Sequence, residues 1–247
     1  MRLYYYPLLI PLLAGLSTII GYFLIYFPSK YQNRIIASSL SFSSGVMFTI
    51  SFFSLIPEAF HFLSLYSLGN SIVIFILFFS LGLLSPYIIN RFIKTESTLY
   101  RIGILSVISL MIHNIPEGIL SFLTTSSNLH LGLSLSLGIA IHNIPEGIAI
   151  AVPIYYSTNS HKKAFLLTFI SGFSEFLGAI FACLFLKNLL NPMLVGAVLS
   201  FTAGIMIYLS IMELLPKSLE LTTFKQFILY FLIGVFVMSC CIFILAI

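Results

Sequence analysis

Residues 113–118 read His-Asn-Ile-Pro-Glu-Gly, and residues 142–147 repeat this sequence without a change. Both copies lie inside long apolar stretches, where an ionisable side chain is costly and by default marks a functional site. The repetition places two histidines and two glutamates in surroundings that exclude water. This pair of segments therefore indicates a metal site inside a membrane.

The composition around the repeat is that of a membrane protein. Of the 247 residues, 60% are hydrophobic and only 7% are charged, and the mean hydropathy is +1.12. Soluble proteins carry roughly a quarter charged residues. No alternation typical of a β-barrel occurs, so the spanning segments are helices whose backbone groups bond within each helix. The sequence predicts an all-α membrane protein with one polytopic transmembrane domain over residues 1–247.

At about 20 apolar residues per span, the hydrophobic stretches separate into eight helices. Short connections join them and leave no room for a soluble domain. We expect the eight helices at residues 6–27, 36–57, 71–93, 102–124, 131–155, 164–186, 193–215 and 226–247.

Lysine and arginine are distributed unevenly between the two ends of these helices. Only Arg2 and Lys187 lie on the side that includes the termini. Because loops rich in basic residues stay in the cytoplasm, we predict that both termini are extracytoplasmic. The compact chain, without a targeting segment, fits a prokaryotic plasma membrane. The nine basic residues of the opposite side are Lys30, Arg34, Arg91, Lys94, Arg101, Lys162, Lys163, Lys217 and Lys225.

The acidic residues are seven glutamates, since the sequence contains no aspartate. Carboxylates in hydrocarbon must face one another, a cation or water, so those inside spans are expected to gather at one site. The glutamates within predicted spans are Glu117, Glu146, Glu175 and Glu213. Those assigned to loops or span ends are Glu58, Glu96 and Glu220.

Two further repeats relate the first spans to the later ones. Residues 15–21 resemble residues 172–178, and residues 45–57 resemble residues 204–216. Spans one and two thus match spans six and seven, which cross the membrane in the opposite direction. Inverted repeats around a midplane site are typical of secondary transporters. We expect a 3+2+3 arrangement, in which spans one to three and six to eight surround spans four and five.

The polar residues of each repeated segment have helical spacing. Positions i and i+4 share one helix face, so His113 is expected near Glu117 and His142 near Glu146. The asparagine of each copy lies about 100° further around the helix. It can offer its oxygen to a second position that shares the glutamate. Each copy therefore supplies ligands for two neighbouring ions.

A proline and a glycine complete each copy. Pro116 and Pro145 lack an N–H group, so each helix is expected to kink and to free a carbonyl near the site. Gly118 and Gly147 permit a neighbouring backbone to come close. The segment is thus suited to an interrupted helix that packs tightly.

Two such helices side by side bring together two imidazoles, two carboxylates and two amides. This set suits a divalent cation that prefers nitrogen and oxygen ligands, such as zinc, iron, manganese or cobalt. Glu175 can complete a second position, with the glutamates of the repeat as bridges. Met47 is either a thioether ligand or a core residue. Glu213 is either a pathway carboxylate or a span-end residue that reaches water or Lys217.

The chain resembles the ZIP (Zrt/Irt-like protein) family of divalent metal transporters, in particular its ZupT-like bacterial branch. The residues that carry the likeness are segments 113–118 and 142–147, with Ser171–Glu175 in span six and Ala203–Pro216 in span seven. The likeness covers essentially the whole chain. It implies eight spans and import of zinc, and of related cations including cadmium, through a binuclear site in mid-membrane.

By position, the resemblance assigns the family's two metal sites to residues of this sequence. The first site falls on His113, Glu117, His142 and Glu146, with Met47 at its edge. The second falls on Asn114, Asn143 and Glu175, which share Glu117 and Glu146. Ser54 stands where relatives of this branch often have a glutamate, so it joins Glu213 as a candidate pathway residue. The cations are cargo, and no prosthetic group is implied.

Two other hypotheses remain open from the sequence alone. A membrane-embedded zinc metallohydrolase would activate a bound water, but no His-Glu-x-x-His motif occurs and the ligand set can fill two coordination shells. A metal sensor would need a soluble output domain. We therefore expect a transporter without enzyme activity, whose partners are divalent cations and bilayer lipid. Scattered basic residues exclude a nucleic-acid surface, and a homodimer is a candidate assembly.

Overall fold

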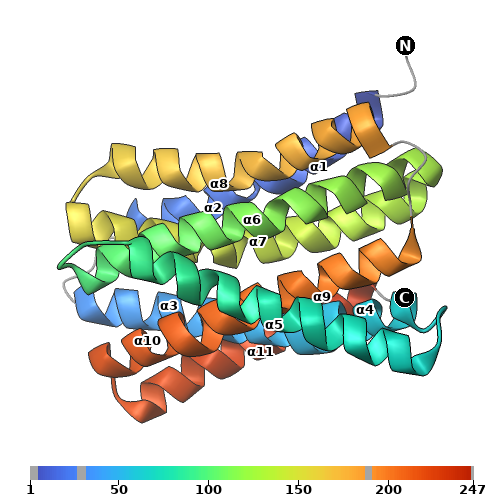
Figure 1. The fold of residues 1–247 in the computed structure, drawn as a ribbon. Helices are drawn as coiled ribbons and strands as arrows, with labels where there is room; N and C mark the ends of the chain where they lie inside the picture. The colour runs from blue at the N-terminus through green and yellow to red at the C-terminus, as the bar shows by residue number, and fades with distance from the viewer. Residues whose placement is uncertain (1–4, 27–31, 187–190, 246–247) are drawn as a thin grey trace.

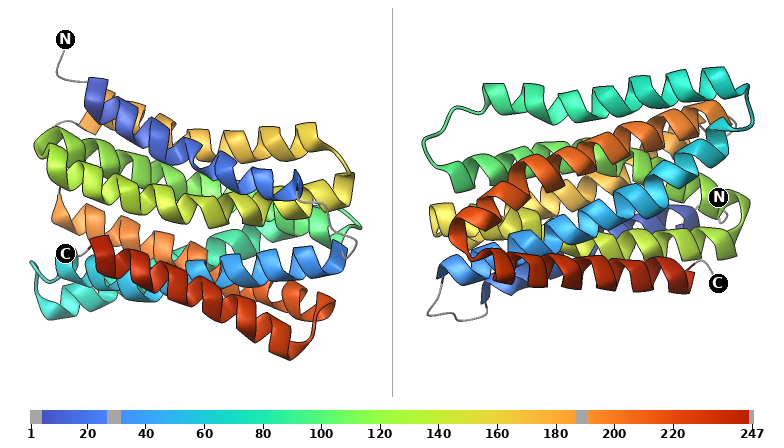
Figure 2. Two further views of the ribbon diagram at one scale, coloured as in Figure 1. Left: turned by 180° about the vertical axis from the view of Figure 1, so that it is seen from behind. Right: turned by 90° about the horizontal axis from the view of Figure 1, so that it is seen from below.

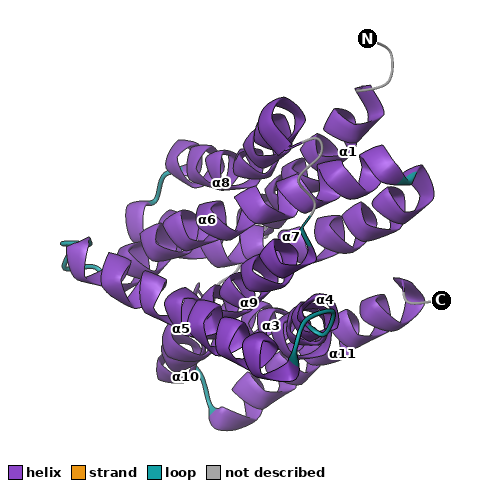
Figure 3. Cartoon of the chain, turned by 45° about the vertical axis from the view of Figure 1, so that its right-hand side comes forward, coloured by secondary structure: helices purple, strands orange, loops and turns teal. Residues whose placement is uncertain are grey.

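The computed structural model describes residues 5–26, 32–186 and 191–245. The described residues form helices and no strand, and their connections are short (Figure 3). Eight of the helical segments are long and apolar enough to cross a membrane, which confirms the all-α prediction with eight spans. In chain order, spans one to eight are Tyr5–Tyr26, Gln32–Leu63, Leu68–Phe92, Thr98–Ser127, Leu129–Thr158, His161–Leu186, Pro192–Leu221 and Phe224–Ile244.

Four spans are single helices and four are built from several helical segments. The single helices are α5 (Leu68–Phe92), α6 (Thr98–Ser127), α7 (Leu129–Thr158) and α11 (Phe224–Leu245). Span one comprises α1 (Tyr5–Leu16), α2 (Thr18–Tyr22) and a 3-10 turn at Phe23–Tyr26. Span two comprises α3 (Gln32–Ile50), a π-helical segment at Ser51–Leu55 and α4 (Ile56–Leu63). Span six comprises α8 (His161–Phe181) and a π-helical segment at Ala182–Leu186. Span seven comprises α9 (Pro192–Tyr208), a π-helical segment at Leu209–Leu214 and α10 (Leu215–Leu221).

The end of span two differs from the sequence prediction in a way that matters for function. The predicted span stops at Pro57, whereas the helix continues to Leu63. Glu58 therefore lies within the helix of span two, more than one turn before its end, and not in a loop. Of the basic residues in the charge count, Arg2, Lys30 and Lys187 lie outside the described residues.

The helices α6 and α7 form the middle of the molecule. In Figure 1 they lie between a layer made of α1, α2 and α8 and a second layer made of α3, α5, α9 and α11. Both central helices pack on helices of each layer, as contacts of α6 with α8 and α9 and of α7 with α2 and α3 demonstrate. Segments 113–118 and 142–147 are thus held in the centre of the bundle.

Helix packing follows the inverted repeat seen in the sequence. Span one packs on span five, and its counterpart, span six, packs on span four. Span three packs on span seven, and its counterpart, span eight, packs on span two (Figure 2). Each of these pairs is converted into another when spans one to three are exchanged with spans six to eight and span four is exchanged with span five. The predicted 3+2+3 arrangement is therefore present in the packing.

Spans two and seven carry the same irregularity at matching positions. A π-helical segment occupies Ser51–Leu55 in span two and Leu209–Leu214 in span seven, and a proline follows each at Pro57 and Pro216. Such π-helical turns are frequent at functional sites because they rotate the side chains that follow them. The two candidate pathway residues, at positions 54 and 213, both lie in these segments.

Candidate metal site

The two copies of the repeated segment face each other across α6 and α7. His113 Nε2 lies 3.1 Å from Glu146 Oε1, and His142 Nε2 lies 3.4 Å from Glu117 Oε1. His113 Nε2 also lies 3.7 Å from Glu117 Oε2 on its own helix, as the i,i+4 spacing predicts. Each histidine is therefore paired with the glutamate of the other copy. We call these four residues the His–Glu cluster.

The His–Glu cluster is almost completely removed from solvent. His113 is 0% exposed and Glu146 is 1% exposed. Several atoms of the cluster form no hydrogen bond of regular geometry among the described residues, although His113 Nε2 and Glu146 Oε1 lie 3.1 Å apart. These atoms are both ring nitrogens of His113, Nδ1 of His142 and both carboxylate oxygens of Glu146. Buried polar atoms are normally satisfied by a partner. A cation that accepts imidazole nitrogen and carboxylate oxygen would satisfy these atoms.

The His–Glu cluster is not closed around one ion. In the described part of the chain, no three His, Cys, Asp or Glu side chains are grouped so that they could hold a metal ion together. The histidines and glutamates contact each other across the two helices instead. To bind a cation, they must exchange these mutual contacts for contacts with the ion.

A second group of polar side chains lies beside the cluster. The Asn143 amide donates to Glu175 Oε2 at 2.8 Å and to the Ala14 carbonyl at 3.0 Å. The Asn114 amide donates to the Ser171 carbonyl at 3.0 Å. Oδ1 of both asparagines and Oε1 of Glu175 have no hydrogen-bond partner in the described chain. These oxygens are the atoms that the second predicted metal position would use.

Two glycines allow the outer spans to pack directly on the central helices. A Cβ atom on Gly118 would overlap the Glu175 carbonyl oxygen, and a Cβ atom on Gly147 would overlap the Thr18 carbonyl oxygen. Thr18 and Glu175 occupy the same position in the repeat of residues 15–21 and 172–178. The same close approach therefore occurs on both sides of the His–Glu cluster, and it brings Glu175 to the site.

Both central helices continue through the prolines of the repeat. Hydroxyl groups from neighbouring spans bond to carbonyls around the proline of α7. Ser43 donates to the Pro145 carbonyl at 2.7 Å, and Ser17 donates to the Ala140 carbonyl at 2.7 Å. Pro145 leaves free the carbonyl of Ile141, four residues earlier, and neither hydroxyl bonds to it. The two hydrogen bonds instead join spans one and two to span five.

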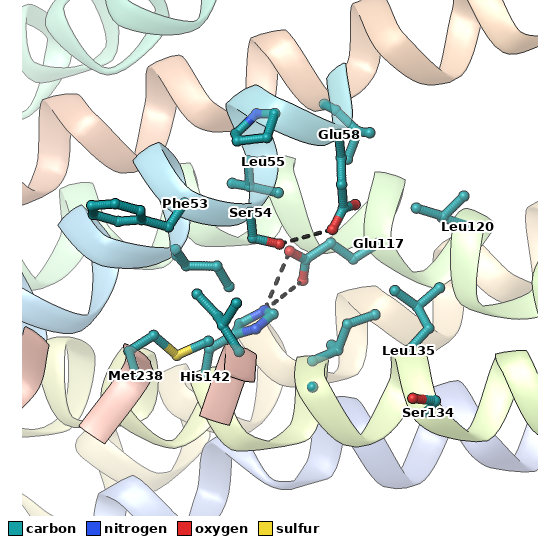
Figure 4. A pocket seen from close by; sticks show the side chains of 16 residues that line it. Phe53, Ser54, Leu55, Glu58, Glu117, Leu120, Ser134, Leu135, His142 and Met238 are labelled. Atoms are coloured by element: carbon teal, nitrogen blue, oxygen red, sulfur yellow. Dashed lines mark hydrogen bonds and ion pairs between the residues drawn. The ribbon is translucent and has the colours of Figure 1, made fainter. Parts of the chain in front are cut away.

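A cavity of about 350 Å³ ends at the His–Glu cluster. Glu117 and His142 line it, together with Ser54 and Glu58 from span two (Figure 4). The rest of the lining is mainly apolar and includes Leu135, Met238 and other residues of spans two, four, five, seven and eight. Part of the predicted metal site thus lines a cavity that also contains Glu58 and Ser54.

Glu58 is the candidate residue that the sequence analysis missed. Ser54 Oγ donates to Glu58 Oε1 at 2.9 Å, so both groups are held on one face of span two. A signal was present in the sequence. Residues 56–58 read Ile-Pro-Glu, as do residues 115–117 and 144–146 within the repeated segments. The third copy of this tripeptide thus marks a further glutamate near the His–Glu cluster, in addition to Glu117, Glu146 and Glu175.

The structure places the two less certain candidates in different surroundings. Met47 is fully buried and belongs to the main apolar core, so its role as a metal ligand remains a prediction. Glu213 lies 3.1 Å from the Arg101 guanidinium and accepts a hydrogen bond from Asn90 at 3.0 Å. Lys217, which was one alternative partner for Glu213, pairs with Glu220 instead.

Eight spans with an inverted repeat, and buried histidines and glutamates beside a cavity, are typical of a membrane transporter. Comparison with known proteins identifies the family. The family model described as "ZIP Zinc transporter" matches residues 93–241. "Zinc transporter ZupT" of Escherichia fergusonii is 41% identical over 229 residues, which cover 87% of each chain. The proteins of the same name from Escherichia coli and Salmonella newport are 39% identical, again with 87% of each chain covered.

The chain belongs to the ZIP family. It is a divalent metal transporter of the ZupT-like type and not an enzyme, which removes the metallohydrolase alternative. The resemblance inferred from the repeated segments is confirmed.

Proposed function

We propose that the protein imports zinc, and that iron, manganese, cobalt and cadmium are its competing cargoes. The relatives named above are zinc transporters by name. The ligand atoms offered by this chain are nitrogen and oxygen, which suit zinc and these other ions. The three cysteines lie in spans six and eight, away from the repeated segments, so no thiolate is offered to a softer ion.

The observation that carries this proposal is the cross-pairing of His113 with Glu146 and of His142 with Glu117. These four residues form the first ion position of the proposed site. Asn114, Asn143 and Glu175 form the second position and share the two glutamates of the first. The unpartnered nitrogen and oxygen atoms in both groups support this assignment, because a bound cation would satisfy them.

The proposed direction of transport is toward the cytoplasm. The charge count places the ends of spans two and eight, and the start of span five, outside the cell. The lining of the cavity includes Glu58, Leu135 and Ile242 from these parts of the chain. The cavity therefore serves as the entrance from outside, and the cation then passes to the His–Glu cluster. This orientation agrees with a prokaryotic plasma membrane and with extracytoplasmic termini.

This function is tested by measuring the uptake of radioactive zinc into proteoliposomes that contain the purified protein. We expect saturable uptake, reduced by excess manganese, iron, cobalt or cadmium in proportion to the affinity of each ion. Liposomes without protein are the control. Purified, homogeneous protein that moves none of these cations would overturn the proposal. The homodimer remains a prediction, which light scattering of the detergent-purified protein tests.

A further inference from the structure

We propose that Glu58, held in position by Ser54, is the loading ligand of the transport pathway: it binds the incoming divalent cation together with Glu117 and His142. This inference rests on the proposed function and adds to it a residue and a step. The cation binds first at the inner end of the cavity, and then moves to the buried ligands of the His–Glu cluster.

The first support is the arrangement of polar groups in the cavity. Glu58, Glu117 and His142 come from three different spans and line the same cavity (Figure 4). Glu117 and His142 also belong to the His–Glu cluster, so they are shared between the cavity and the buried site. As they lie in the described structure, the three side chains are not grouped closely enough to hold one ion, so Glu58 must move toward Glu117 and His142 when the cation binds. A cation held by all three residues would then already contact two ligands of the next position.

The second support is the hydrogen bond between Ser54 and Glu58. The hydroxyl donates to one carboxylate oxygen, Oε1, at 2.9 Å across one turn of span two. A carboxylate accepts at two oxygens, so this bond orients Glu58 and still leaves it capacity to bind a cation. Glu58 does more than accept this hydrogen bond, because its half-buried side chain also lines the cavity with Glu117 and His142.

The third support is the charge of the cavity. Its lining includes two glutamates, and no lysine or arginine is among the described residues that form it. Most of the wall is apolar, with residues such as Phe53 and Leu199. Negative charge within walls of low polarity focuses the electric field and raises the local concentration of cations. The cavity therefore favours entry of a cation over entry of an anion.

The test is a comparison of wild type with Glu58→Gln, which removes the charge and keeps the size of the side chain. In zinc uptake by proteoliposomes, we expect KM to rise roughly tenfold or more, since charge focusing of this kind changes association by at least this factor. The maximal rate should change much less, because the His–Glu cluster is intact. Calorimetric titration of the detergent-purified protein should give a matching loss of zinc affinity.

Restoring a carboxylate within the cavity should reverse the effect. Position 54 lies one turn from position 58 and lines the same cavity. The double variant Ser54→Glu with Glu58→Gln should therefore regain most of the wild-type KM and zinc affinity. Glu58→Asp should be intermediate. The matched control is Glu96→Gln, because Glu96 is exposed in the loop between α5 and α6. This variant should leave KM and zinc affinity unchanged.

The outcomes separate the two proposals. If wild type transports zinc and Glu58→Gln has the same KM and zinc affinity, Glu58 is not a loading ligand, although the proposed function stands. If wild type does not transport any divalent cation, the proposed function itself fails. Should Glu58→Gln not fold, Ser54→Ala provides the test, because it keeps the charge and removes the orienting bond. A smaller rise in KM is then expected, and an unchanged KM would overturn the proposal.

Discussion

Arg101 and Glu213 form an ion pair with a distance of 3.1 Å, which joins α6 to the π-helical segment of span seven. Arg101 also donates to Asn90 at 2.6 Å, and Asn90 donates to Glu213 at 3.0 Å. Along α6, Arg101 precedes His113 by about three turns, whereas the cavity lies beyond His113 at Glu117 and Leu120. The bundle is therefore tied together on the side of the His–Glu cluster away from the cavity.

Removing Arg101 should destabilise the protein. The Glu213 side chain is 4% exposed and would lose its ion-pair partner in Arg101→Gln, whereas the Arg101 side chain is 29% exposed. Loss of one partner from a buried pair costs several kcal/mol, and partial exposure reduces this to roughly 1–3 kcal/mol. Thermal unfolding in detergent should show a lower midpoint for Arg101→Gln than for the double variant with Glu213→Gln. Equal midpoints would contradict the idea that the unpaired carboxylate is the cause.

Removing the close approach at Gly147 should also destabilise the protein. The methyl group in Gly147→Ala would overlap the Thr18 carbonyl, so spans one and five must separate. Overpacking of this kind costs about 1–3 kcal/mol. Gly69→Ala is the control, because nothing lies within 4 Å of a Cβ atom at that position. The midpoint of thermal unfolding should fall for Gly147→Ala and should not fall for Gly69→Ala. Similar midpoints for the two variants would show that the close contact is unimportant.

The cross-pairing predicts strong coupling between the two copies of the repeated segment. His113 and Glu146 lie 3.1 Å apart on different helices. If they bind one cation, the effects of His113→Ala and Glu146→Ala on zinc affinity should not add in the double variant. We expect a coupling free energy of about 0.5–3 kcal/mol from calorimetric titrations of the four proteins. Additive effects would place the two residues at separate ions.

Zinc binding should weaken as the pH falls. Metal ligands must be deprotonated, so protons compete with the ion for His113, His142 and the glutamates around them. Histidine changes its charge in the range of about pH 5 to 8. The apparent zinc affinity of the purified protein should therefore be lower at about pH 6 than at about pH 8. The same affinity at both values would argue against histidine ligands.

Sequence reasoning reached the eight spans and the centre of the site because both depend on local patterns. Apolar runs of span length determine the helices, and the exact repetition of residues 113–118 at 142–147 points to the proposed ligands. The cross-pairing of His113 with Glu146 depends on how α6 and α7 are rotated against each other, which no local pattern specifies. Glu58 was missed because span two continues for more than a turn beyond the predicted end.

The partner of Glu213 was missed for a similar reason. Lys217, one turn away in sequence, was one of the alternatives considered for Glu213, but the Glu213 side chain pairs with Arg101 from another span. Contacts between spans distant in sequence follow from the packing of the whole bundle. The inverted repeat predicts which spans meet, although it does not predict which side chains meet, since position 54 is a serine where position 213 is a glutamate.

The most direct test of the central claim is zinc uptake by proteoliposomes with wild type, Glu146→Ala and the exposed control Glu96→Ala, each purified and shown to be folded. Glu146 is 1% exposed, and its Oε1 lies 3.1 Å from His113 Nε2 of the other copy. We predict saturable uptake by wild type and Glu96→Ala, and loss of uptake in Glu146→Ala. If a folded Glu146→Ala protein takes up zinc at the wild-type rate, the claim that the repeated segments bind the transported metal is contradicted.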